Sequence, residues 1–121
     1  MLDKILYIAP SEDAWSEPLI DELTRKMTAT LRAATPSPWF MGYHTCACGS
    51  HSKAHNFILP DGLITNSLCV HYLAWHRNEV PREELEKIAK LTSGKADPDA
   101  SELAPPRAIN RSRRRHPPLR R

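Results

Sequence analysis

The chain has 121 residues, of which 40% are hydrophobic and 26% are charged, and its formal net charge at pH 7 is +3. This length allows one domain, and these apolar and charged fractions exclude a wholly disordered chain. No stretch approaches the ~20 consecutive apolar residues of a membrane-spanning helix. The N-terminus soon turns polar, which is unlike a secretory signal, so we expect a cytoplasmic protein.

The positive charge belongs to the C-terminal end of the chain. Residues 1–94 carry 9 basic and 11 acidic side chains, a net of −2, whereas residues 95–121 carry 8 basic and 3 acidic side chains, a net of +5. The second segment has few large apolar residues, so burial cannot offset its chain entropy. We therefore predict a folded domain over 1–94 and a disordered Arg/Pro-rich tail over 95–121.

Two elements are predicted before residue 40. The apolar run at 5–8 is typical of a short strand or an apolar lead-in. Apolar residues then recur at helical spacing over 16–34, with Ser16 as a plausible N-cap. Pro36 and Pro38 are expected to end this helix.

The middle of the chain predicts a small hairpin and two helices. Residues 44–49 are expected to be extended and to end in a turn. The Asp-Gly pair within 56–65 lies between two apolar runs and predicts a β-hairpin. Helices are expected over about 68–78 and about 81–92, the second closed by Gly94. The predicted fold class is α+β and mostly helical.

Cysteine and histidine are concentrated in one part of the chain. All three Cys and five of the six His fall between His44 and His76. In a reducing compartment, three Cys do not indicate a disulfide framework. The clustering therefore points to a metal site.

The spacing of the cysteines favours zinc. On a strand, Cys46 and Cys48 point the same way with Cα atoms ~6.5 Å apart, which suits two thiolates with Zn–S bonds of ~2.3 Å. Cys69 lies in the first turn of a predicted helix, where backbone N–H groups stabilise a thiolate. This layout is that of small treble-clef-like or ribbon-like zinc sites. We predict a zinc-binding α+β domain over 1–94.

Spacing alone leaves the fourth ligand open. His44 is ranked first because it shares the strand face of the two cysteines, His71 second and His51 third, and an Asp or a water could also complete the shell. His76 shares a helix face with Cys69 but lies ~10.5 Å along the axis of a straight helix. It is therefore not expected to join Cys69 on one ion.

Three segments carry a resemblance to known sequences: YHTCACG at 43–49, TNSLCVHYLA at 65–74 and HRNEVP at 76–81. They resemble a family of short bacterial proteins that has no known activity. The similar stretch covers less than half of the chain. The resemblance implies a bacterial source and carries no mechanism.

Two classes of function remain open for the domain. The first is a binding or adaptor module with a structural zinc ion. The second is a small enzyme, using either zinc with an open water position and Glu79 as base, or Cys69 as nucleophile. In the latter form, His44 or His71 would be the base and Asn66 would orient it. The chain lacks the HExxH, zinc-deaminase and phosphate-loop motifs.

The tail indicates a partner with negative charge. A nucleic acid or an anionic surface would be bound by charge, and such binding falls steeply with salt. No aromatic residue lies between the arginines, so base stacking is not indicated. The residues proposed for this contact are Arg111, Arg113, Arg114 and Arg115.

Overall fold

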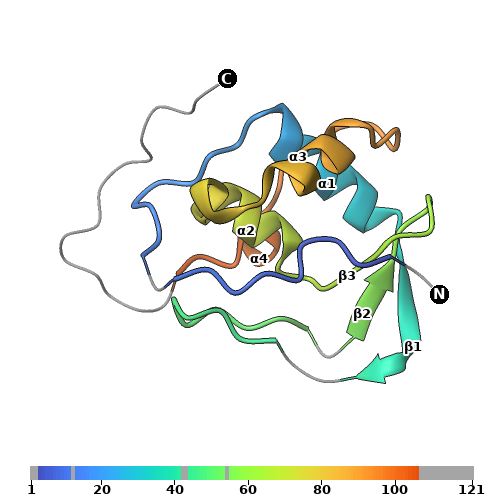
Figure 1. The fold of residues 1–121 in the computed structure, drawn as a ribbon, viewed down its shortest axis with the longest axis horizontal. Coiled ribbons are helices and arrows are strands. Elements are labelled where there is room, and N and C mark those ends of the chain that lie inside the picture. The colour runs from blue at the N-terminus through green and yellow to red at the C-terminus, as the bar shows by residue number, and fades with distance from the viewer. Residues whose placement is uncertain (1–2, 12, 42–43, 54, 107–121) are drawn as a thin grey trace.

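The computed structural model describes residues 3–11, 13–41, 44–53 and 55–106, without the side chains of 38–41. Figure 1 shows the helices gathered around α2, with a small sheet beside them. The α+β class is confirmed. The elements are α1 (Glu22–Arg32), β1 (Thr35–Met41), β2 (His55–Ile58), β3 (Ile64–Thr65), α2 (Cys69–Trp75), the 3-10 helix η1 (Arg77–Glu79), α3 (Arg82–Ala89) and α4 (Ala100–Leu103). In the described part of the chain, no helix is long and apolar enough to cross a bilayer.

The predicted hairpin is formed by β2 and β3 within an antiparallel sheet of order β1-β2-β3. Its turn is closed by the N–H of Leu59, which donates to the carbonyl oxygen of Leu63 at 2.7 Å. Gly62 has φ of +90°, a left-handed conformation that costs glycine little because it has no Cβ. Local turn chemistry therefore sets this part of the fold.

Strand β1 was not predicted. Pro36 and Pro38 follow the end of α1, as expected, but both then lie within β1. Each proline lacks a backbone N–H, which is tolerated on an edge strand because one side of it needs no partner. β1 is an edge strand in the order β1-β2-β3, and its register against β2 shifts between Pro36 and Met41.

Helix α1 begins later than predicted. Its N-cap is Asp21 rather than Ser16. The preceding segment 15–19 instead donates two backbone N–H groups to α2, to the carbonyl oxygens of Trp75 at 3.2 Å and Ala74 at 2.8 Å. The last carbonyl groups of a helix have no partner inside it. The segment therefore satisfies the C-terminal end of α2 instead of extending α1.

The core is built around α2, because all seven residues from Cys69 to Trp75 are buried. Packed with it are the buried residues Ile5 and Leu6 from the N-terminal run and Met27 from α1. The N-terminal run does not form a strand of its own. Lys4, the residue before the run, makes one parallel bridge to Ile64 of β3.

The structure also describes a segment beyond the predicted domain boundary at residue 94. Residues 95–106 are described and contain α4, whose N-terminus is closed by a capping box between Asp99 and Glu102. Glu102 also pairs with Arg32 of α1 at 2.7 Å. Capping and ion pairs hold this segment, so a count of large apolar residues does not detect it. Residues 107–121, including the four arginines assigned to nucleic-acid binding, lie outside the described residues.

Candidate metal centre

The two closely spaced cysteines lie on a tight loop, residues 44–52. The N–H of Cys46 donates to the carbonyl oxygen of Ser50 at 2.9 Å, and the N–H of Gly49 donates back to the carbonyl oxygen of Cys46 at 2.8 Å. Gly49 has φ of +98°, which glycine adopts at little cost. This turn follows the predicted extended piece and places the sulfurs of Cys46 and Cys48 in the buried interior.

Two histidines come from α2 and its C-terminal end. His71 is the third residue of the helix, whereas His76 follows the last one and has φ of −133° and ψ of +31°. Five positions apart in a regular helix, the two side chains would point about 140° away from each other. Because the helix ends at Trp75, the two rings instead lie with centroids 5.0 Å apart.

These four side chains form one buried group. Their ligand atoms all lie within 4.8 Å of one another. Cys46 Sγ is 3.4 Å from His76 Nε2, and Cys48 Sγ is 3.3 Å from His71 Nε2. Zn–S and Zn–N bonds of ~2.3 and ~2.0 Å at a tetrahedral angle place such atoms about 3.5 Å apart. The group could therefore hold a metal ion, and its spacing is compatible with zinc.

The local electrostatics of Cys46 and Cys48 favour a negative charge that could bind a cation. The hydrogen bond from Cys46 lowers the pKa of the Cys48 thiol, an effect that burial opposes. The same hydrogen bond, together with burial, raises the pKa of Cys46. The pair thus shares one proton and favours a thiolate at Cys48. A bound cation would stabilise the second thiolate as well.

The position of the ring hydrogen of His71 is set by the chain near α4. Its Nδ1 lies 2.7 Å from the carbonyl oxygen of Ala104 and 3.2 Å from that of Leu103. A carbonyl oxygen only accepts, so Nδ1 carries the hydrogen and donates it. Nε2 is then left with its lone pair, on the side where Cys48 lies. In metal sites, a histidine ligand is oriented in the same way, by a hydrogen bond that its other ring nitrogen donates.

His76 has a different environment. Its Nδ1 is buried and has no hydrogen-bond partner among the described residues. The nearest acidic group is the carboxylate of Glu79, with Oε2 at 3.7 Å. That carboxylate is held by Ser11, whose backbone N–H and hydroxyl donate to it at 2.8 and 3.1 Å.

Of the predicted ligands, the structure brings together Cys46, Cys48 and His71. Cys69 is not in the group, because it lies on a face of α2 that packs into the core. Burial raises the pKa of its thiol to about 12. The structure therefore places Cys69 in the core and apart from the four-residue group, which differs from the ligand role predicted for it.

His44 is also outside the group. Its Nε2 lies 3.1 Å from the side-chain oxygen of Asn56, and its ring contacts Tyr7 edge-on. The bend that would bring it round to the cysteines does not occur, because its backbone pairs with Ser52 across the loop at 2.7 and 2.8 Å. His51, ranked third, is exposed and lies 3.2 Å from the hydroxyl of Thr45.

His76 is the group member that sequence reasoning missed. In a straight helix through residue 78, His76 cannot share a site with Cys69. The available signal was the spacing of the two histidines, because four residues lie between His71 and His76. Structural zinc sites with two histidines commonly have three to five residues between them.

No protein-family model, curated protein or solved structure matches this chain. The fold and the site therefore define it only as a small α+β protein with a buried Cys2His2 group that could bind a metal.

Proposed function

We propose that this chain is a small zinc-binding protein whose single Zn²⁺ has a structural role. The proposed ligands are Cys46, Cys48, His71 and His76. The observation that carries the proposal is the pair of sulfur–nitrogen distances, 3.4 and 3.3 Å, which match the edges of a zinc tetrahedron. Two thiolates and two imidazoles are a donor set that zinc prefers.

A structural role is supported by the burial and number of the donors. The four side chains are between 0% and 2% exposed. Four protein ligands fill a tetrahedral shell and leave no position for a substrate or a reactive water. The ion would tie the loop 44–52 to α2, and structural zinc in small domains contributes roughly 10 kcal/mol or more of apparent binding energy.

The role of such a protein is proposed to be that of a binding or adaptor module in the bacterial cytoplasm. The resemblance of its central segments to short bacterial proteins supports a bacterial source. The Arg-rich residues 107–121 would add charge-driven affinity for nucleic acid, and this affinity should fall steeply as salt rises. Full-length protein and a variant ending at residue 106 should differ in retention on nucleic acid but not in metal content.

The enzyme alternative has less support. A nucleophilic cysteine needs an accessible thiolate, whereas Cys69 is fully buried and its pKa is raised to about 12. Glu79, the proposed base for a zinc-bound water, is hydrogen-bonded to Ser11. Cys69 is therefore not placed as a nucleophile requires, and four protein ligands would leave no zinc-bound water for Glu79 to activate.

Elemental analysis of purified protein tests the proposal. We expect one zinc per chain in the native protein. Adding a strong chelator should lower Tm by 10 °C or more, because each loss of roughly 1 kcal/mol in the free energy of unfolding lowers Tm by about 4–8 °C in a domain of this size. Cys46→Ser, Cys48→Ser, His71→Ala and His76→Ala should each lose metal. Cys69→Ala and His44→Ala are the matched controls and should keep it. The proposal would be overturned if the native protein contained no metal and its Tm were the same with and without the chelator.

A further inference from the structure

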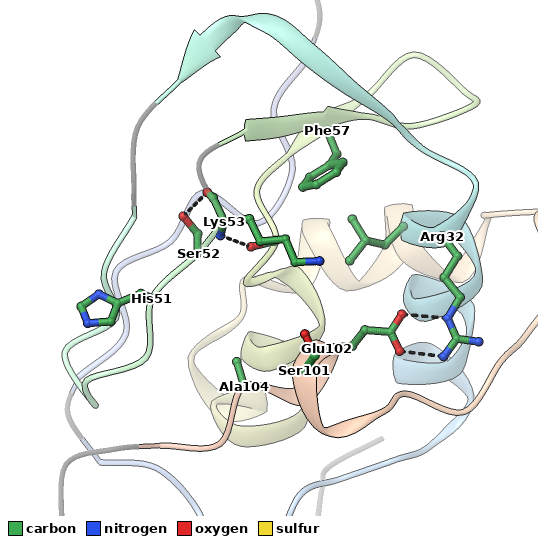
Figure 2. Close-up of a pocket in the computed structure, with 10 residues that line it drawn as sticks. Arg32, His51, Ser52, Lys53, Phe57, Ser101, Glu102 and Ala104 are labelled. Atoms are coloured by element: carbon green, nitrogen blue, oxygen red, sulfur yellow. Dashed lines mark hydrogen bonds and ion pairs between the residues drawn. The ribbon is translucent and has the colours of Figure 1, made fainter.

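The C-terminal clasp, which we define as residues 99–106, is held against the domain without burying a helix face. None of the four residues of α4 is buried. A cavity of about 270 Å³ lies along it, as Figure 2 shows. The cavity is lined by residues that include Arg32, Lys53, Phe57, Ser101, Glu102 and Ala104. Leu103 and Ala104 pack against the core as half-buried residues, so apolar contact is only one part of what holds the clasp in place.

On one side, the clasp contacts one candidate ligand, His71, and two residues that adjoin other ligands on the same elements. His71 Nδ1 donates to the carbonyl oxygen of Ala104 at 2.7 Å. The hydroxyl of Ser50, two residues after Cys48, lies 2.8 Å from the same oxygen. The indole N–H of Trp75, next to His76, donates to the carbonyl oxygen of Leu103 at 3.0 Å.

A second contact lies on the other side of the clasp. Glu102 receives two hydrogen bonds of 2.7 Å from Arg32, drawn as dashed lines in Figure 2. This pair is bidentate, and the side chains of Arg32 and Glu102 are 45% and 15% exposed, so it also helps to hold the clasp. The position of the clasp thus depends on α1 as well as on the loop and the helix that carry the four candidate ligands.

We propose that residues 99–106 are a metal-dependent clasp: the Ala104 carbonyl oxygen positions His71 for the ion, and the bound ion in turn holds the clasp. The inference rests on the proposed function. With the hydrogen kept on Nδ1, the imidazole presents Nε2 to the metal. Coordination at Nε2 draws electron density from the ring, which makes the Nδ1 hydrogen a stronger donor to Ala104.

This coupling is reciprocal by thermodynamic necessity. The docked clasp raises metal affinity by some factor. The bound metal raises the equilibrium constant for docking of the clasp by the same factor.

Ala104 offers a matched pair of variants for the test. Its φ is +45°, a left-handed conformation that glycine adopts easily and that proline cannot adopt. Ala104→Pro also removes the N–H that donates to the carbonyl oxygen of Ala100 at 3.0 Å. Ala104→Gly keeps that bond and the backbone conformation. Neither change touches a ligand side chain.

Affinity for Co²⁺ is measured on the full-length chain and both variants, from the visible absorption that thiolate-bound tetrahedral Co²⁺ gives. We expect Ala104→Pro to bind Co²⁺ about 10–100-fold more weakly, the usual cost of losing a group that orients a ligand. Ala104→Gly should stay close to the native affinity. Equal affinity of native protein and Ala104→Pro overturns the clasp alone, whereas absence of Co²⁺ binding to native protein overturns the proposed function and the clasp together.

Hydrogen exchange on the unmodified chain keeps the test independent of how the variants fold. The N–H groups of Leu103 and Ala104, which donate within the clasp, should exchange about 10–100-fold more slowly with Zn²⁺ than without it. The N–H of Leu85 in α3 is the reference and should change less. Equal slowing at all three positions would mean that the metal folds the whole domain at once, and would overturn a separate clasp.

Discussion

The guanidinium of Arg77 donates two hydrogen bonds, of 2.8 and 2.6 Å, to the carboxylate of Asp21, which lies 56 residues earlier in the chain. Arg77 directly follows His76 of the candidate metal centre, and its side chain is only 4% exposed. Asp21 is at the same time the N-cap of α1, where it accepts from the N–H of Thr24. One half-buried ion pair therefore joins the start of α1 to the chain that leaves the centre.

Replacing Arg77 by Ala should destabilise the fold. The change leaves Asp21 without its partner and removes further bonds to the carbonyl oxygen of Leu73 and the hydroxyl of Thr24. We expect a loss of about 2–3 kcal/mol in the free energy of unfolding, below the range for a fully buried pair because Asp21 is 34% exposed. Urea denaturation of metal-loaded protein measures it.

The control for this prediction is Arg82→Ala. Arg82 is 90% exposed and pairs with Glu86 one turn away, so its loss should cost at most about 0.5 kcal/mol. Similar losses for the two variants would contradict a structural role for the half-buried pair.

The same pair predicts how stability depends on acid. Burial raises the pKa of Asp21, but the hydrogen bonds and charge of Arg77 outweigh it, so the pKa lies below the ordinary value of 3.8. A carboxyl with a depressed pKa stabilises the fold above its unfolded-state pKa, and this contribution is lost as pH falls through the folded-state pKa. We therefore expect stability to decline below about pH 4 in part because of Asp21.

Asp21→Asn isolates this contribution. Loss of metal at low pH affects the native protein and the variant alike, so the informative quantity is the difference between their free energies of unfolding. That difference should be largest near pH 7 and should shrink towards pH 3. A constant difference across this range would show that Asp21 does not titrate differently in the two states.

The elements that follow from local chemistry were predictable. The hairpin at 56–65 has Asp-Gly in its turn, and α3 begins directly after Pro81, which is suited to the start of a helix. The elements that depend on distant partners were not. β1 contains two prolines and exists because β2 offers an edge to pair with. α4 is held by contacts with α1, α2 and the loop at Ser50.

The site followed the same division. Clustering along the chain was enough to select Cys46, Cys48 and His71, because closely spaced donors of these types are uncommon without a shared ligand. The choice between Cys69 and His76 depended on where α2 ends and which of its faces packs inward. The end of α2 and the face that it turns inward are set by segment 15–19 and by the core. The spacing of metal-binding residues along the chain carries no information about either.

The three cysteines should differ sharply in reactivity. In metal-loaded protein we expect no rapid reaction with a thiol reagent at pH 7, because two thiolates are coordinated and Cys69 is buried with a pKa of about 12. Chelation should release Cys46 and Cys48 for labelling, and Cys69 should react only on unfolding. Mass spectrometry of the labelled peptides gives the order. Rapid labelling of Cys69 in native protein would revive the nucleophile hypothesis.

Glu79 is expected to tune the metal centre through His76. A histidine ligand normally donates its second ring N–H to an acceptor, and His76 Nδ1 lies 3.7 Å from Glu79 Oε2 without a hydrogen bond. A small movement on metal binding would close this gap. Because the gap exceeds hydrogen-bond length, Glu79→Gln should weaken metal affinity by at most about tenfold, less than the usual cost of losing such a partner.

The measurement is competition for Zn²⁺ against a chromophoric chelator at fixed pH. Glu86→Gln is the control, since Glu86 is exposed and pairs only with Arg82 among the ion pairs of the described residues. The unfolding free energy of metal-free protein should change little in either variant, because Glu79 is partly exposed. Unaltered affinity in Glu79→Gln would mean that the long contact with His76 does not shorten when the ion binds.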